Sequence, residues 1–323
     1  MNKIYSYLLI GWCFVLTSCD FNQHANSTGK YLEIILVQGS NCSKNLFDIF
    51  RNNLISAQKP ILESEIYGET KNHFKIIPIL EKDFSSIFRT HKNIVILNSS
   101  KEFNIQVNKD VWSKNQKVYF CSIDNQENDD SIIKFSQQVA AQIKDNEIKR
   151  RVRNHHNLTP PNILSYLQRK HQLSISLPNR FFIIDSLNGI LYLRGETKTS
   201  SQMILISPFL QSPKIENIVL EKNKIAKDKI SSSAQGSYLQ IEDRTPIYID
   251  SVIAPNQKNI TIKGLWRMEG DFMGGSFMSG LIYNPTTMKR FLISLYLYAP
   301  GENKANYLLD LEAILKSVKY INN

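Results

Sequence analysis

The chain has 323 residues, which is enough for two domains with separate hydrophobic cores. It is basic, with 39 Lys and Arg residues against 29 Asp and Glu residues, but its lysines are scattered along the chain. It has no zinc-finger spacing and no basic motif interleaved with aromatic residues, so composition argues against a dedicated nucleic-acid-binding protein.

The first 18 residues predict a processing signal. Lys3 precedes a mostly apolar run, residues 4–16, which is shorter than the roughly 20 residues that a membrane-spanning helix needs. The run ends in Leu16-Thr17-Ser18-Cys19, and small residues before a cysteine resemble the bacterial lipobox. We therefore expect residues 1–18 to be removed and Cys19 to carry the acyl chains, such as palmitate, that anchor the protein to a membrane. The alternatives are an ordinary cleaved signal and a buried cysteine that stands there by chance.

Residues 19–30 are polar and predict a tether that keeps the folded part close to the membrane. Asp20 favours retention in the inner membrane, and the run of acidic residues associated with surface export is absent. We expect the protein to face the periplasm in the cell envelope, and we leave the choice between inner and outer membrane open.

Between residues 31 and 157, short apolar runs alternate with helical spacings of apolar residues. Strands are predicted at residues 31–38, 74–80, 93–97 and 117–123, and helices at residues 44–56, 82–89 and 131–154. An exposed turn is expected around Trp112. The alternation predicts an α/β domain over residues 31–157. Its last helix ends in the basic cluster 149–153, which suits a helix C-terminus and is a candidate for contact with lipid headgroups.

The segment Leu158-Thr159-Pro160-Pro161 is the best internal boundary, because a proline pair rarely lies inside a helix or strand. The sequence that follows this boundary is rich in predicted strands. They lie at residues 173–177, 181–184, 189–193, 203–206, 238–241, 247–249, 260–266, 277–283 and 291–298. Helices are predicted at residues 162–171 and 214–230 and at the C-terminus, where Leu308, Leu311, Leu315 and Val318 repeat at helical spacing. Residues 158–323 therefore predict an α+β domain with an antiparallel sheet and a C-terminal helix.

Residues 264–277, with the sequence GLWRMEGDFMGGSF, form the most distinctive segment. Its glycines allow positive φ angles or close backbone approach, and Phe272, Met273 and Phe277 are expected to fill apolar space. We prefer the interpretation as a tight structural loop between two strands. The alternative is a loop that contacts a ligand, with six candidate residues: Trp266, Arg267, Asp271, Phe272, Gly274 and Gly275.

This segment resembles the DUF4837 family of uncharacterised Bacteroidota lipoproteins, whose members carry G-x-W followed by D-F-M-G-G-P-F. The segments 235–238, 298–301 and 311–315 are similar to the same family, and so is the stretch 84–97, so that the resemblance covers nearly all of the chain after Cys19. Ser276 and Lys92 depart from the family pattern. The resemblance implies a lipoprotein and no known activity.

Motifs for catalysis and for cofactor binding are absent from the sequence: there is no phosphate-binding loop, G-x-G-x-x-G, G-x-S-x-G or H-E-x-x-H. His155, His156 and His171 lack a cysteine or carboxylate at ligand spacing, so we predict no metal site. We nominate no catalytic residue and expect no cofactor. Cys42 and Cys121 are the cysteines that remain after processing, and they form either a disulfide or two buried thiols.

These observations favour a non-enzymatic, membrane-anchored envelope protein that acts as a binding or accessory factor for another envelope component. A carrier of a small or lipidic ligand is the first alternative, and an unrecognised hydrolase is the second. A deep apolar cavity in the second domain favours the carrier, a closed cleft with a carboxylate or histidine favours the enzyme, and exposed aromatic surface favours the partner-binding role.

Overall fold

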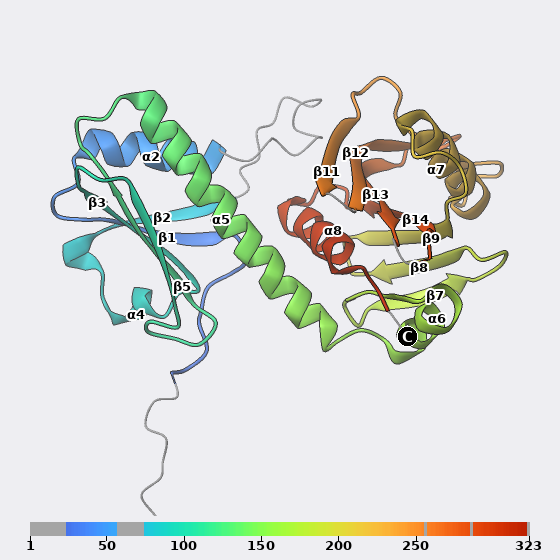
Figure 1. Ribbon diagram of the computed structural model, residues 1–323, viewed down its shortest axis with the longest axis horizontal. Coiled ribbons are helices and arrows are strands. Elements are labelled where there is room, and N and C mark those ends of the chain that lie inside the picture. The colour runs from blue at the N-terminus through green and yellow to red at the C-terminus, as the bar shows by residue number, and fades with distance from the viewer. Residues whose placement is uncertain (1–23, 57–73, 255–256, 285–286, 322–323) are drawn as a thin grey trace, which may run out of the picture. The chain divides into compact units, whose positions relative to one another are not determined.

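A computed structural model describes residues 24–56, 74–254, 257–284 and 287–321. The described residues fall into two compact units, the first reaching Phe135 and the second built mainly from Ser136 onward (Figure 1). This division lies inside a long helix, whereas the boundary that the sequence predicts lies just after that helix. Cys19 and the rest of the predicted signal lie outside the described residues.

The first unit is an α/β sheet of five strands in the order β2-β1-β3-β5-β4. Four strands are parallel, and the edge strand β4 is antiparallel to its neighbour β5. The strands are β1 (Glu33–Gln38), β2 (Lys75–Leu80), β3 (Asn93–Ser99), β4 (Asn104–Lys109) and β5 (Lys117–Ile123). The near-continuous apolar run of β1 is buried on both faces, as a parallel strand requires.

The helices of the first unit are α2 (Lys44–Ser56), the short η1 (Glu81–Asp83) and α4 (Ser86–Arg89). The predicted helix 44–56 and the predicted strand 117–123 are confirmed to the residue. Strand β4 was not predicted, because its sequence NIQVNK is mostly polar. Its two apolar residues, Ile105 and Val107, are only half-buried at the edge of the sheet.

Residues 24–30, which the sequence predicts as part of a free tether, are attached to the first unit. Ser27 donates a backbone hydrogen bond to Lys114 at 3.0 Å, and Thr28 donates one to Thr90 at 2.8 Å. Lys92 and Lys114 in turn donate backbone hydrogen bonds to Thr28 and Ala25. The expectation of a free linker is therefore wrong for these residues, because backbone hydrogen bonds hold a segment whose polar side chains offer no apolar surface to bury.

The second unit is built on an antiparallel sheet, as predicted, and this sheet has eight strands among the described residues. The strand order is β10-β12-β13-β14-β9-β8-β7, and β11 pairs with a second stretch of the long strand β12. The strands are β7 (Phe181–Asp185), β8 (Leu191–Glu196), β9 (Ser201–Pro208), β10 (Tyr238–Ile241), β11 (Tyr248–Ala254), β12 (Gln257–Glu269), β13 (Gly274–Tyr283) and β14 (Arg290–Tyr298). The short strands β6 (Leu173–Ser174) and β15 (Lys319–Tyr320) pair separately.

Helices cover both faces of this sheet. On one face, α6 (Pro161–His171) and α8 (Ala305–Ser317) contribute Leu167 and Leu311 to a buried apolar cluster. On the other face, α7 (Ile215–Lys229) contributes Ile218 and Ile225 to a second cluster. The unit therefore has three layers, which explains why its strand pattern is apolar on both sides.

The long helix α5 (Asp129–His156) carries the basic cluster 149–153. Two of its arginines are buried: Arg150 pairs with Glu147, and Arg151 pairs with Asp310 of α8. The suggestion that this cluster faces lipid headgroups is therefore wrong for these two side chains. Among the helices of the described residues, none combines the length and the apolar character needed to cross a membrane.

Candidate functional site

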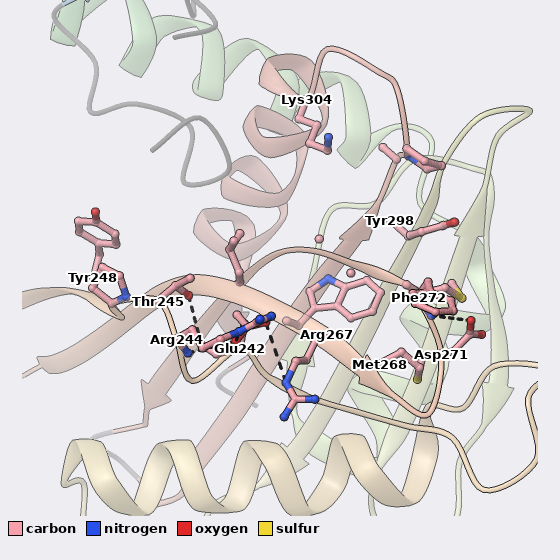
Figure 2. A pocket seen from close by; sticks show the side chains of 18 residues that line it. Glu242, Arg244, Thr245, Tyr248, Arg267, Met268, Asp271, Phe272, Tyr298 and Lys304 are labelled. Atoms are coloured by element: carbon pink, nitrogen blue, oxygen red, sulfur yellow. Dashed lines mark hydrogen bonds and ion pairs between the residues drawn. The ribbon is translucent and has the colours of Figure 1, made fainter. Parts of the chain in front are cut away.

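A pocket of about 1040 Å³ opens at the end of the second unit's sheet where the β12–β13 hairpin turns (Figure 2). Its lining comes from this hairpin, from the loop between β10 and β11, and from the turn that follows β14. The pairing of β12 with both β10 and β13 brings these segments together, with Ile241 opposite Trp266 and Gly275 opposite the same tryptophan.

All six residues that the sequence nominates as a ligand-contacting loop line this pocket: Trp266, Arg267, Asp271, Phe272, Gly274 and Gly275. The turn Tyr298-Ala299-Pro300, which also carries the resemblance to the family, lines it as well. Two segments that are about 25 residues apart in the sequence thus meet at one place. The six residues have different roles in the pocket. The presence of several of them is explained by packing alone.

Trp266 is part of the architecture. Its side chain is 1% exposed, and its Nε1 donates a hydrogen bond to the Leu297 carbonyl at 3.1 Å. Gly275 makes this contact possible, because a Cβ at that position would lie 2.0 Å from the same carbonyl oxygen. A Cβ at Gly274 would lie 3.0 Å from the Trp266 carbonyl oxygen. The glycine pair is therefore explained by close approach of neighbouring strands.

Asp271 fixes the conformation of the hairpin turn. Its Oδ1 accepts a hydrogen bond from the Phe272 backbone N–H at 2.7 Å, while Gly270 adopts a φ of +79°. A hydrogen bond from the Ser232 hydroxyl, followed by the one from the Phe272 backbone, lowers the pKa of the Asp271 carboxyl. The turn is closed by a hydrogen bond of 2.8 Å from the Met268 N–H to the Met273 carbonyl. Its backbone is therefore held in one conformation.

Phe272, at the tip of this turn, is fully exposed, with a relative exposure of 108%. The expectation that it fills apolar space is wrong, although Met273 packs against the core and Phe277 is buried in it as expected. The turn needs a side chain at this position to point outward, and nothing in the packing of the described residues requires that side chain to be aromatic.

A row of three charged residues, Glu242, Arg244 and Arg267, lines the pocket between its two ends (Figure 2). Glu242 accepts hydrogen bonds from Arg244, at 2.7 Å from Nε and 2.5 Å from Nη2. Arg267 pairs with Glu269, and its Nε lies 4.0 Å from Glu242. The hydrogen bonds from Arg244 hold the pKa of Glu242 at about 2, so this carboxyl is ionised at neutral pH.

Sequence reasoning missed several residues of the lining, including Glu242, Arg244, Tyr248, Tyr298 and Lys304. For Tyr298 a signal existed, since its turn resembles the family pattern. For the loop between β10 and β11 no local signal existed, because its place in the pocket depends on the pairing of β10 with β12. Figure 2 shows Tyr248 and Thr245 at one end of the pocket, and Met268, Asp271 and Phe272 at the other.

The pocket lining combines charged, hydroxyl-bearing and apolar side chains. Its lining contains no histidine, cysteine or serine, and its two carboxylates both have lowered pKa values. A general acid or base for use near neutral pH needs a pKa closer to 7. Within the described residues, no group of three or more His, Cys, Asp and Glu side chains is placed to hold a metal ion.

The remaining residues singled out by the sequence lie elsewhere. Cys42 and Cys121 are buried free thiols of the first unit, and burial raises the pKa of Cys42 to about 11. His155 is buried, and its Nε2 lies 3.4 Å from Asp310, whereas the adjacent His156 is exposed. His171 is buried against aromatic rings of the second unit.

Comparison with known proteins relates the chain to two families. Residues 160–317 match the family described as Domain of unknown function (DUF4837), and residues 27–156 match Domain of unknown function (DUF8532). The stretch 84–97, expected from its sequence to belong to the first family, lies in the second match. The DUF8532 match ends at residue 156, and the DUF4837 match begins at residue 160, directly before Pro161, which opens α6.

Among solved structures, the chain is similar to a mutant of the protein Mog1, with 10% identity and a TM-score of 0.31 over 47% of this chain and 92% of that one. It is also similar to the Saccharomyces cerevisiae Ran-binding protein Mog1p, with 10% identity and a TM-score of 0.30 over 47% of this chain and 91% of that one. Likeness at this level carries no argument about function. A comparison with curated proteins gives no match.

Proposed function

Because residues 160–317 belong to the DUF4837 family, a family of unknown function, we propose a role for this chain from the chemistry of its pocket. The protein is a membrane-anchored factor that binds another component of the cell envelope through the pocket at the β12–β13 turn. It acts by binding and carries out no reaction of its own.

The observation that carries this proposal is the exposure of Phe272 on a turn of fixed conformation beside the pocket. Burying a phenylalanine side chain contributes roughly 1.5–3 kcal/mol, which the protein gains only when another molecule covers the ring. Aromatic side chains in fixed positions are typical anchors of binding surfaces, because little conformational entropy is lost when they are covered. Phe272 therefore supplies an apolar anchor at one end of the pocket.

The paired charges supply specificity between the two ends of the pocket. Glu242, Arg244, Arg267 and Glu269 hold one another in place, so that a partner meets groups whose positions are already set. Such pre-organised charges favour a partner with complementary polar groups and exclude purely apolar molecules. The lining thus fits a polar segment of another envelope protein that brings one apolar side chain to Phe272.

The membrane anchor in this proposal is supported by the sequence Leu16-Thr17-Ser18-Cys19. Cys19 is the residue that carries the acyl chains, and the folded units face the periplasm. Metabolic labelling with palmitate tests this part: label is expected in the wild-type protein and not in the Cys19→Ala variant. Label that is equal in both proteins contradicts the anchor.

Site-specific photo-crosslinking in the native lipoprotein tests the binding role. A photoreactive side chain in place of Phe272 is expected to give a discrete crosslinked product with one envelope protein. Leu210 is the matched control, because it is an apolar residue of the same unit that is 93% exposed, following β9. The absence of a product at position 272, or the same product at both positions, contradicts the proposal.

A carrier of a small ligand is the second candidate, and the pocket volume of about 1040 Å³ favours it. Apolar side chains such as Leu265 and Met268 line part of the pocket. The open form of the pocket and the outward direction of Phe272 are better suited to a macromolecular partner. Mass spectrometry of the protein purified under native conditions separates the two, since a carrier retains a bound small molecule of constant mass.

A further inference from the structure

The parallel strands of the first unit gather positive charge at one edge of their sheet. Strands β1, β2, β3 and β5 are parallel, so their N-terminal ends lie at the same edge, together with the C-terminal end of β4. This edge and the loops that lead into it form what we call the basic edge, defined by six lysines: Lys30, Lys75, Lys92, Lys109, Lys114 and Lys117. The acidic residues described there are Glu33 and Asp110.

Glu33 does not cancel the charge of the basic edge. It is buried, and it pairs with Lys75 at 3.0 Å and with His91 at 2.9 Å. The Lys75 side chain still has 72% of its surface exposed. Lys30, Lys109 and Lys114 are exposed as well. The edge therefore presents a surplus of positive charge to its surroundings.

The opposite edge of the same sheet, where the parallel strands end, is acidic. It carries seven acidic residues: Glu81, Asp83, Glu102, Asp124, Glu127, Asp129 and Asp130. Three exposed lysines, Lys44, Lys82 and Lys101, lie among them. The first unit thus has charges of opposite sign at its two edges, and a charged surface would orient it.

The chain enters the first unit at the basic edge. Residues 25–28 are hydrogen-bonded to Thr90, Lys92 and Lys114, which belong to loops at this edge, and Figure 1 draws the segment in dark blue where it leads into β1. Ala25 lies six positions after Cys19 in the sequence, a stretch of chain that spans at most about 22 Å. An acyl anchor on Cys19 would therefore keep the basic edge near the bilayer surface.

We propose that the basic edge of the first unit binds anionic phospholipid headgroups and orients this unit on the membrane. The proposal rests on the acyl anchor of the proposed function for its place in the cell, while the binding itself needs only the lysines. The occupant is a lipid surface, because charge complementarity and the point of chain entry both indicate it. Lysines are attracted to an anionic surface when they lie within a Debye length of about 8–10 Å from it. The short stretch of chain from Cys19 to Ala25 allows the basic edge to come that close.

The test uses the full mature chain with Cys19→Ala, so that no acyl chain contributes to binding. Binding is measured by cosedimentation with vesicles of phosphatidylcholine alone and with vesicles containing about one third phosphatidylglycerol. We expect binding to the anionic vesicles to be at least about tenfold stronger and to weaken as salt is raised.

Two charge-reversal variants locate the binding surface. The basic-edge variant carries Lys30→Glu, Lys109→Glu and Lys114→Glu, and the control carries Lys44→Glu, Lys82→Glu and Lys101→Glu, which changes the net charge by the same amount. We expect the first to lose at least about tenfold in affinity for anionic vesicles, and the second to stay within about twofold of the parent. Equal losses in both variants, or equal binding to neutral vesicles, overturns the proposal.

Urea unfolding shows whether the variants are folded, and the corresponding Lys→Gln variants replace any that are not. The result can be separated from the proposed function. Absence of vesicle binding with normal palmitate labelling and a normal crosslink at position 272 removes only the headgroup contact. Absence of labelling with normal vesicle binding removes only the anchor.

Discussion

The side-chain nitrogen of Lys222 lies 3.8 Å from the centroid of the Phe277 ring in the core of the second unit. The centroid of the Tyr296 ring lies 4.6 Å from the same nitrogen, for which the described part of the chain supplies no hydrogen-bond partner. Gly264 leaves the space for the Phe277 ring, because a Cβ there would lie 2.7 Å from it. A segment that the sequence marks as distinctive therefore helps to enclose a buried amine.

Replacement of Lys222 by methionine is expected to stabilise the second unit. Burial lowers the pKa of Lys222 in the folded chain well below its ordinary value of 10.5. At pH values between the folded-state pKa and 10.5, the folded chain therefore holds fewer protons than the unfolded chain. The wild-type free energy of unfolding therefore rises with pH through this window, and the variant lacks that slope. At neutral pH we expect the variant to be more stable by about 1–2 kcal/mol.

Urea unfolding at pH 7 and at alkaline pH, followed by the fluorescence of Trp266, measures both effects. Lys224→Met is the control, because Lys224 lies on the same helix and is exposed. A destabilised Lys222→Met protein with an unchanged pH slope shows that the contacts with the aromatic rings outweigh the cost of burying the amine.

Gly275→Ala is expected to destabilise the second unit by about 2–4 kcal/mol, since the new methyl group meets the Leu297 carbonyl and displaces the hydrogen bond from Trp266. Unfolding in urea measures the loss. Gly236→Ala is the comparison: Gly236 has a φ of +75° and no atom within 4 Å of a built Cβ, so only backbone strain of about 1 kcal/mol is expected. Equal losses would show that the close approach of the Leu297 carbonyl costs no more than backbone strain does at Gly236.

Glu33→Gln is expected to weaken the first unit at neutral pH. Burial raises the pKa of Glu33, but hydrogen bonds from His91 and Lys75 outweigh it and bring the value to about 2, compared with 4.5 when unfolded. The stabilisation is complete above pH 4.5 and is lost as pH falls from 4.5 toward 2. We expect a loss on the order of 2 kcal/mol at pH 7 and none near pH 2.

Urea unfolding at several pH values, followed by the fluorescence of Trp112, gives this comparison. Glu102→Gln serves as control, because Glu102 is exposed at the opposite edge of the sheet. A Glu33→Gln protein that loses the same stability at pH 3 as at pH 7 would show that shape, and not charge, matters at this position.

Long apolar runs made much of the fold predictable. Helix α2 and strand β5 were placed to the residue because their spacing is regular and their ends are marked. Strand β4 was missed because an edge strand needs little apolar surface. The contact of His91 with Glu33 could not be read from the sequence, because the two residues are 58 positions apart and meet only through the pairing of β1 with β3.

The candidate site was predictable only in part. The segment 264–277 could be identified from its clustered glycines, which are uncommon inside a strand. The loop with Glu242 and Arg244 could not, since it reaches the pocket through strand pairing. The exposure of Phe272 could not be foreseen either, because alternation of side chains does not continue through a turn whose backbone Asp271 controls.

Phe272→Ala is expected to leave stability unchanged and to abolish binding. The ring is fully exposed, so its removal changes the free energy of unfolding by less than about 0.5 kcal/mol. In the partner complex, the loss of a buried aromatic anchor costs about 2 kcal/mol or more, which is at least a thirtyfold loss of affinity. Crosslinking from a second site in the pocket, Tyr248, measures binding without using position 272.

Phe272→Leu shows whether this residue binds the partner through its apolar surface or through its aromatic ring. A leucine keeps most of the apolar surface and is expected to retain a large part of the crosslink from Tyr248, whereas alanine is not. If alanine and leucine both leave the crosslink at its wild-type level, the ring is not the anchor, and the charged row around Glu242 has to account for binding alone. If both abolish it, the partner requires an aromatic ring, as stacking on a planar group would demand.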